Sequence, residues 1–84
     1  MTTYKLGKLN YELLKTLDVS ELGNDFKMDD TDLTFSTNNI RLLMIILNEI
    51  IVEKGMENQD VVTEYGKRLY GLYDEIYIAS KLER

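Results

Sequence analysis

The sequence contains no cysteine, no histidine, no tryptophan and no proline. Without cysteine and histidine, the chain cannot form disulfide bonds, zinc sites built on those residues, cysteine nucleophiles or histidine general bases. None of its three serines (Ser20, Ser36 and Ser80) lies in a Gly-x-Ser-x-Gly turn, and no glycine-rich phosphate-binding motif is present. We therefore expect a protein that is not an enzyme and that needs no cofactor and no metal.

Long apolar stretches are also missing. The longest uninterrupted apolar run, at 42–47, has six residues, whereas a membrane-spanning helix needs about 20. Residues 1–10 alternate polar and apolar side chains and lack the apolar segment of a signal peptide. These features predict a cytoplasmic protein that does not bind membranes. Alanine occurs once against seven isoleucines and six asparagines, a bias typical of an AT-rich coding sequence and hence of a low-GC bacterium or one of its phages.

What the sequence does contain is typical of one small acidic domain. Its 84 residues include 15 acidic and 10 basic side chains, giving a net charge of -5, and 44% of them are apolar. A chain of this length buries only about 60% of the surface that it exposes when unfolded, so a partner subunit would add stability. We treat residues 1–84 as a single domain.

The composition along the chain predicts a mainly α fold around a central hydrophobic helix at about 38–54. Ten of the 13 residues at 40–52 are apolar, and the three polar ones share one narrow sector of the helical wheel. A surface helix would show only an apolar stripe, so we expect this helix to be buried on almost every side. Four residues are candidates for its N-cap, namely Ser36, Thr37, Asn38 and Asn39, and Gly55 suits the left-handed residue that ends it.

A long C-terminal helix is predicted at about 58–82, packed against the central helix as a helical hairpin. Its apolar positions recur at steps of three and four residues, namely Val62, Tyr65, Leu69, Leu72, Ile76 and Ala79. Because this helix is expected to begin near Asn58, about seven residues at its other end, including Ile76 and Tyr77, should extend beyond the central helix.

A row of tyrosines lies beside this seam and has two interpretations. The row can pack against the N-terminal part of the chain with its hydroxyls at the rim. Alternatively, it can form a partner surface, because tyrosine combines a large contact area with a polar tip. The candidate partner-binding residues are Tyr70, Tyr73, Ile76 and Tyr77. Together with the uncovered helix end, they predict a two-fold homodimer centred near Ile76.

The N-terminal part of the chain shows weaker patterns. Leu6, Leu9, Leu13 and Leu17 recur at helical spacing, which predicts a short N-terminal helix. Residues 26–35 alternate apolar and polar side chains around an acidic stretch, which indicates either a short β-hairpin or an irregular acidic loop.

Acidic residues concentrate at 18–32, which carries a net charge of -5. The candidate acidic surface consists of Asp25, Asp29, Asp30 and Asp32. A calcium-binding EF-hand loop that starts at Asp30 would need glycine and glutamate where the chain has Phe35 and Arg41, so we expect no such site. A solvated loop and a surface that imitates nucleic-acid phosphates remain as interpretations.

These features lead to three functional hypotheses. The first is a small acidic protein-binding module that occupies a partner protein's surface, such as an inhibitor or regulator encoded by a phage or mobile element. The second is a nucleic-acid-mimicking inhibitor of a DNA- or RNA-handling enzyme, in the style of anti-CRISPR or anti-restriction proteins. The third is a structural or assembly subunit. Direct nucleic-acid binding is not expected, because Lys67-Arg68 is the only adjacent basic pair in an acidic chain.

Overall fold

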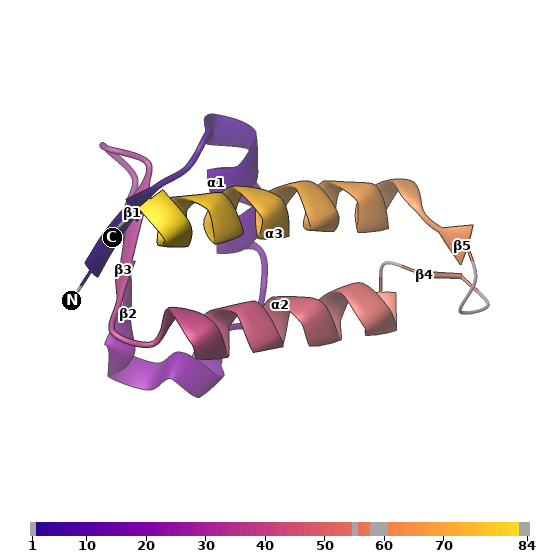
Figure 1. Cartoon of the computed structure of the whole chain (residues 1–84), viewed down its shortest axis with the longest axis horizontal. Coiled ribbons are helices and arrows are strands. Elements are labelled where there is room, and N and C mark those ends of the chain that lie inside the picture. The colour runs from indigo at the N-terminus through magenta and orange to yellow at the C-terminus, as the bar shows by residue number, and fades with distance from the viewer. Residues whose placement is uncertain (1, 55, 58–60, 83–84) are drawn as a thin grey trace.

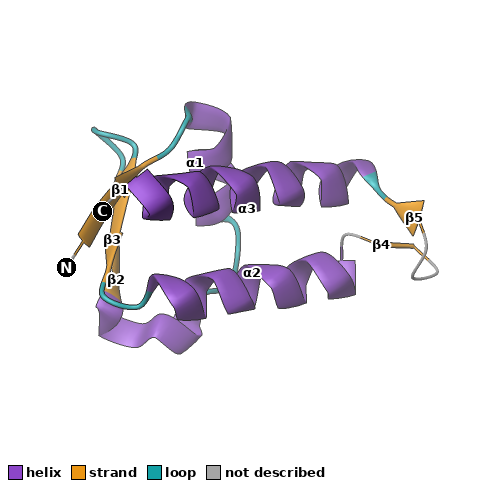
Figure 2. Cartoon of the chain, in the orientation of Figure 1, coloured by secondary structure: helices purple, strands orange, loops and turns teal. Residues whose placement is uncertain are grey.

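Two antiparallel helices, α2 (Ile40–Lys54) and α3 (Glu64–Leu82), form the long axis of the molecule (Figure 1). The structure is a computed structural model that describes residues 2–54, 56–57 and 61–82. Around the helical hairpin lie a helix α1 (Lys8–Lys15), a 3-10 helix η1 (Ser20–Asp25) and strands β1 (Thr2–Lys5), β2 (Phe26–Asp29) and β3 (Thr34–Thr37). The fold is thus mainly helical with a small sheet at one end of the hairpin, as predicted (Figure 2).

Both long helices begin where a side chain accepts a hydrogen bond from the first turn. The side-chain oxygen of Asn39 accepts the N–H of Leu42 at 3.1 Å, and the Thr63 hydroxyl accepts the N–H of Gly66 at 3.0 Å. These contacts satisfy amide groups that have no partner inside the helix. The predicted central helix at 38–54 is confirmed to within two residues. Its expected cap, Gly55, lies outside the described residues.

The start of the C-terminal helix was predicted six residues too early. A pair of short antiparallel strands, β4 (Met56–Glu57) and β5 (Val61–Val62), connects the long helices, and α3 begins only at Glu64. Consecutive β-branched valines favour extended backbone over helix, which accounts for the difference. The predicted starting residue, Asn58, lies outside the described part of the chain.

The sheet has the strand order β1-β3-β2, and both pairings are antiparallel. Phe35 on the central strand pairs with Tyr4 on one side and Met28 on the other. The ring of Tyr4 stacks on that of Phe35 with centroids 5.2 Å apart. Of the two interpretations of 26–35, the β-hairpin is therefore confirmed. The third strand, β1, was not predicted.

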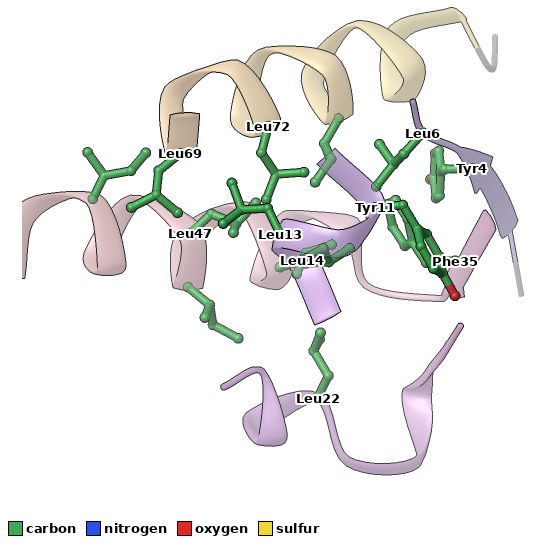
Figure 3. Packing of buried hydrophobic residues seen from close by; sticks show 14 residues of the cluster. Tyr4, Leu6, Tyr11, Leu13, Leu14, Leu22, Phe35, Leu47, Leu69 and Leu72 are labelled. Atoms are coloured by element: carbon green, nitrogen blue, oxygen red, sulfur yellow. The ribbon is translucent and has the colours of Figure 1, made fainter. Parts of the chain in front are cut away.

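The core lies where α1 and the sheet cover one side of the helical hairpin. Leu13 and Leu14 of α1 project toward Leu47 of α2 and Leu72 of α3 (Figure 3). The short N-terminal helix is confirmed, but the predicted leucine stripe is wrong at Leu9, whose side chain is 73% exposed. The helical spacing was counted from Leu6, which precedes α1, so it placed Leu9 on the wrong side of the helix.

The C-terminal end of α3 does not project beyond the rest of the molecule, contrary to the sequence-based expectation. It contacts β1, and the Glu75 carboxylate accepts the backbone N–H of Gly7 at 3.1 and 3.2 Å and the side-chain amide of Asn10 at 2.7 Å. Glu75 thereby accepts the N–H of Gly7, the N-cap of α1, and ties the start of α1 to α3. The N-terminal segment covers this end of α3.

None of the helices in the described ranges is long and apolar enough to cross a membrane.

Candidate functional site

The other side of the helical hairpin is not covered by α1 or by the sheet, and it carries a groove of about 920 Å³ between α2 and α3. We call this side the open face. It exposes apolar and aromatic side chains at matching positions of the two helices, namely Ile45 and Val52 on α2 and Tyr70, Tyr73 and Tyr77 on α3. Exposed fractions reach 49% for Ile45 and 59% for Val52. The expectation that α2 is buried on almost every side is therefore wrong on this side.

The sequence produces this face because both helices carry more apolar residues than one side can bury. On α2, Leu43, Ile46 and Leu47 are buried, and Ile45 lies on the opposite side of the helix. On α3, the predicted seam is confirmed: Leu69, Leu72 and Ile76 are fully buried, while Tyr65 and Ala79 pack against the core. Val62 of that seam belongs to β5 instead.

The tyrosine row accordingly lies at the edge of the core and not against α1. Tyr73 is half-buried and lines the groove with Tyr77, whose side chain is 44% exposed. Tyr70 lies one helical turn before Tyr73 and is 38% exposed. Of the two interpretations of this row, the geometry favours the one in which the tyrosines are available to a partner.

Ile76 requires a correction among the candidate partner-binding residues. Its side chain is 0% exposed and belongs to the core, because the N-terminal segment covers this part of α3. Ile76 therefore cannot reach a partner's surface without unfolding of the chain. The sequence analysis missed the α2 side of the groove, where Arg41, Met44 and Ile45 take part in the lining. The available signal was the polar sector of the helical wheel, because Arg41, Asn48 and Glu49 all line the groove and Ile45 lies within the same sector.

Charges of opposite sign lie at the two ends of the groove. Because the helices are antiparallel, Arg41 near the start of α2 and Lys81 near the end of α3 line the same end, whereas Glu49 lines the wall further along α2. The ammonium of Lys81 lies 4.9 Å from the ring centroid of Tyr77, within cation–π range. The neighbouring Tyr77 side chain raises the pKa of Lys81, so this end of the groove stays positive at neutral pH.

The predicted acidic residues have structural contacts within the chain. The Tyr11 hydroxyl donates to Asp30 at 2.6 Å, and the Lys15 ammonium lies 3.2 Å from the other carboxylate oxygen. The hydrogen bond from Tyr11, followed by that from Lys15, lowers the pKa of Asp30. In turn, burial and the contact with Asp30 raise the pKa of Tyr11 to about 12. Asp30 therefore holds the hairpin turn against α1.

The other three aspartates do not form one surface. Asp25 accepts the N–H of Asn38 at 3.0 Å, at the end of β2 opposite to the turn. Asp29 accepts the N–H groups of Thr31 and Asp32 at 2.9 and 3.3 Å and so stabilises the turn. The four residues of β2 span about 13 Å, which separates Asp25 from the others. Of the four predicted aspartates, Asp32 alone has a carboxylate without a hydrogen-bond partner within the described ranges.

A further group of carboxylates was not singled out from the sequence. Asp18, Glu21, Glu49 and Glu53 line a hollow of about 360 Å³ between η1 and α2. Asp18 accepts the N–H of Ser20 at 3.1 Å, and its contact with Ser20 lowers the pKa of this carboxyl group. The spacing of Glu49 and Glu53 on one helix was the available signal, but nothing in the sequence placed 18–21 beside them.

The described residues offer no arrangement typical of metal or covalent chemistry. Within the described ranges, no group of three or more His, Cys, Asp or Glu side chains is placed to hold a metal ion. Comparisons with protein-family models, curated proteins and solved structures give no match to this chain. The groove and the exposed side chains beside it make the open face the candidate site.

Proposed function

We propose that the chain is a non-catalytic protein-binding module that occupies a partner protein's surface with its open face. The observation that carries the proposal is the row of exposed apolar and aromatic side chains along the groove, around Ile45 and Tyr77. Apolar and aromatic side chains that line a groove together with charged ones are typical of contact sites. Tyrosine and arginine, both present in this groove, are enriched at such sites.

The sequence supports the same proposal from a different direction. The chain lacks the cysteine and histidine on which most nucleophilic and acid–base sites depend. A role as inhibitor, regulator or assembly subunit needs only a surface that another protein recognises. A source in a phage or mobile element and a cytoplasmic location are parts of this proposal that rest on composition.

Site-specific photo-crosslinking in cells that naturally produce the protein tests the proposal. A photoreactive phenylalanine analogue in place of Tyr77 should give a covalent adduct with another protein, whereas the same analogue in place of Leu9 on α1 should not. Leu9 is the matched control because it is exposed and apolar but does not line the groove. The adduct should disappear in a chain that carries both the analogue in place of Tyr77 and the substitution Ile45→Asp. Absence of any adduct with another protein at both Tyr77 and Tyr70 would contradict the proposed function.

The alternative of a nucleic-acid mimic depends on the acidic residues, and a clean test must spare those that hold the fold. Replacing all four predicted aspartates would also remove the contacts of Asp25, Asp29 and Asp30. Neutralising Asp32, Glu21 and Glu53 lowers the charge without removing any of these contacts. A mimic should then lose partner binding, and wild-type binding should weaken steeply with salt. Binding that is insensitive to both changes would exclude mimicry.

A further inference from the structure

We propose that the open face docks a second copy of this chain, with a two-fold axis that lies in the plane of this face, perpendicular to the helices, and crosses them at Ile45 and Tyr77. This inference rests on the proposed function, because both treat the open face as a protein-binding surface. It replaces the dimer centre expected near Ile76, whose side chain is buried in the single chain. Spacing and charge on the open face point to a second copy as the occupant.

The spacing of the exposed residues fits a facing pair of helices. Ile45 and Val52 on α2 are seven residues apart, and so are Tyr70 and Tyr77 on α3. A seven-residue repeat keeps side chains on one side of a helix, where they can interdigitate with those of a neighbouring helix. Each line can lie along one helix of a second hairpin, as in a four-helix bundle. About the proposed axis Ile45 and Tyr77 meet their own copies, whereas Val52 and Tyr70, seven residues away, lie toward the ends of the interface.

The charges on α2 are complementary to their own copy about an axis at Ile45. Arg41 precedes Ile45 by four residues and Glu49 follows it by four, so each lies about 6 Å along the helix from the axis. In an antiparallel copy, Arg41 of one chain then lies opposite Glu49 of the other, and the pair occurs twice. Both side chains are exposed, and neither forms an ion pair with a described residue.

The charges on α3 fit the same axis independently. Tyr77 lines the groove across from Ile45, and the exposed Asp74 and Lys81 lie three residues before it and four after it. The two-fold operation that brings Arg41 to Glu49 therefore also brings Lys81 near Asp74 of the second copy. On each helix, one basic and one acidic side chain therefore lie on opposite sides of the axis. A two-fold interface requires this self-complementarity.

The first experiment measures the mass in solution of the purified full chain by light scattering across micromolar concentrations. The wild type and Leu9→Asp should reach twice the 9.8 kDa mass of one chain, and Ile45→Asp should stay at the mass of a single chain. Circular dichroism checks that Ile45→Asp keeps its helical fold, which is expected because Ile45 is 49% exposed. A strictly monomeric wild type, or a dimer unchanged by Ile45→Asp, would overturn the proposal.

The second experiment tests the orientation by exchange of charges. Arg41→Glu and Glu49→Arg should each weaken the dimer about tenfold, because each places like charges opposite one another twice. An equimolar mixture of the two variants should recover wild-type affinity, since every pair across the axis again has opposite signs. A mixture no tighter than the separate variants would overturn the two-fold register.

These outcomes separate this inference from the proposed function. If the charge variants weaken the dimer and their mixture restores it, while no adduct with another protein forms in cells, then the second copy is the occupant of the open face and the proposed function fails. A monomer that still forms a Tyr77-dependent adduct with another protein would overturn the dimer and leave the binding module standing.

Discussion

Both sides of the helical hairpin carry apolar side chains, but only one side is covered by α1 and the sheet. On the covered side, Ile46 of α2 and Leu72 of α3 pack under α1 and the sheet and are almost completely buried. On the open face, one residue away along α2, Ile45 has about half of its surface exposed. The difference shows that the apolar positions of a helical wheel indicate how much surface is suited to burial. They do not show whether the same chain buries it.

The largest expected effect compares two neighbouring isoleucines. Ile46→Asp should unfold the protein, because an unpaired charge in the core costs several kcal/mol against a total stability of roughly 5–10 kcal/mol. Ile45→Asp should leave the free energy of unfolding of the single chain within about 0.5 kcal/mol. Urea unfolding followed by circular dichroism, at concentrations where the chain is monomeric, measures both. An Ile46→Asp variant with a wild-type transition would show that the covered side is not a core.

A smaller effect is expected where the cover is attached to α3. Glu75→Gln should destabilise the fold by about 2 kcal/mol, because hydrogen bonds from Gly7 and Asn10 to an ionised carboxylate are lost or weakened. Glu64→Gln is the matched control, because its contact with Lys67 is exposed and should contribute about 0.5 kcal/mol or less. Equal effects of the two variants in urea unfolding would mean that Glu75 does not hold α1 in place.

The contact between α1 and the hairpin turn should appear as a pH dependence. The pKa of Tyr11 is raised to about 12, so the stability that it contributes is complete below pH 10, the ordinary value, and is lost as the pH rises through 12. The pKa of Asp30 is lowered, so its contribution is lost only as the pH falls below its ordinary value of 3.8.

Tyr11→Phe should remove the alkaline dependence and reduce the acidic one, because the hydrogen bond from Lys15 to Asp30 remains. Absorbance titration of the wild type should show tyrosine ionisation near pH 12, and the amplitude of this late phase should fall in the variant. A late phase of unchanged amplitude in Tyr11→Phe would show that the raised pKa does not belong to Tyr11.

The smallest effect is expected in the turn between β2 and β3. Asp29→Ala should cost about 1 kcal/mol, because two backbone N–H groups lose their acceptor. Asp32→Ala should change the free energy of unfolding by less than about 0.5 kcal/mol, as expected for an exposed surface position. Thermal unfolding of the two variants side by side provides the comparison, and a larger loss for Asp32→Ala would contradict this account of the turn.

The sequence was sufficient for elements that carry strong local patterns. The apolar run and the polar residues at 36–39 located α2, although only the structure shows that Asn39 is the cap, and the three- and four-residue steps from Tyr65 to Ala79 located the buried side of α3. The strand β1 was missed because its four residues contain a single buried side chain, Tyr4, and pair with β3 about 30 residues away. No local pattern reports such a pairing.

The candidate site was predictable only on one of its two helices. The tyrosine spacing identified Tyr73 and Tyr77, but Ile76, one position before Tyr77, was assigned to the same surface although it lies in the core. On α2, the polar sector that holds Arg41 and Glu49 indicated the exposed side, and Ile45 lies within it. How far the exposure extends beyond that sector depends on where α1 and the sheet pack, and that placement is a tertiary property.

The contact between Gly7 and Glu75 has a consequence for the kinetics of folding. The two residues are 68 positions apart, and closing a loop of that length costs about 2.5 kcal/mol more chain entropy than a contact between residues about four positions apart. The α2–α3 hairpin and the β2–β3 hairpin close much shorter loops, so they should form earlier, and the docking of β1 and α1 should limit the folding rate. We expect the reverse step, the undocking of β1 and α1, to be the local unfolding event with the lowest free energy. The amides of β1 and α1 should therefore exchange with deuterium before those at the centre of α2.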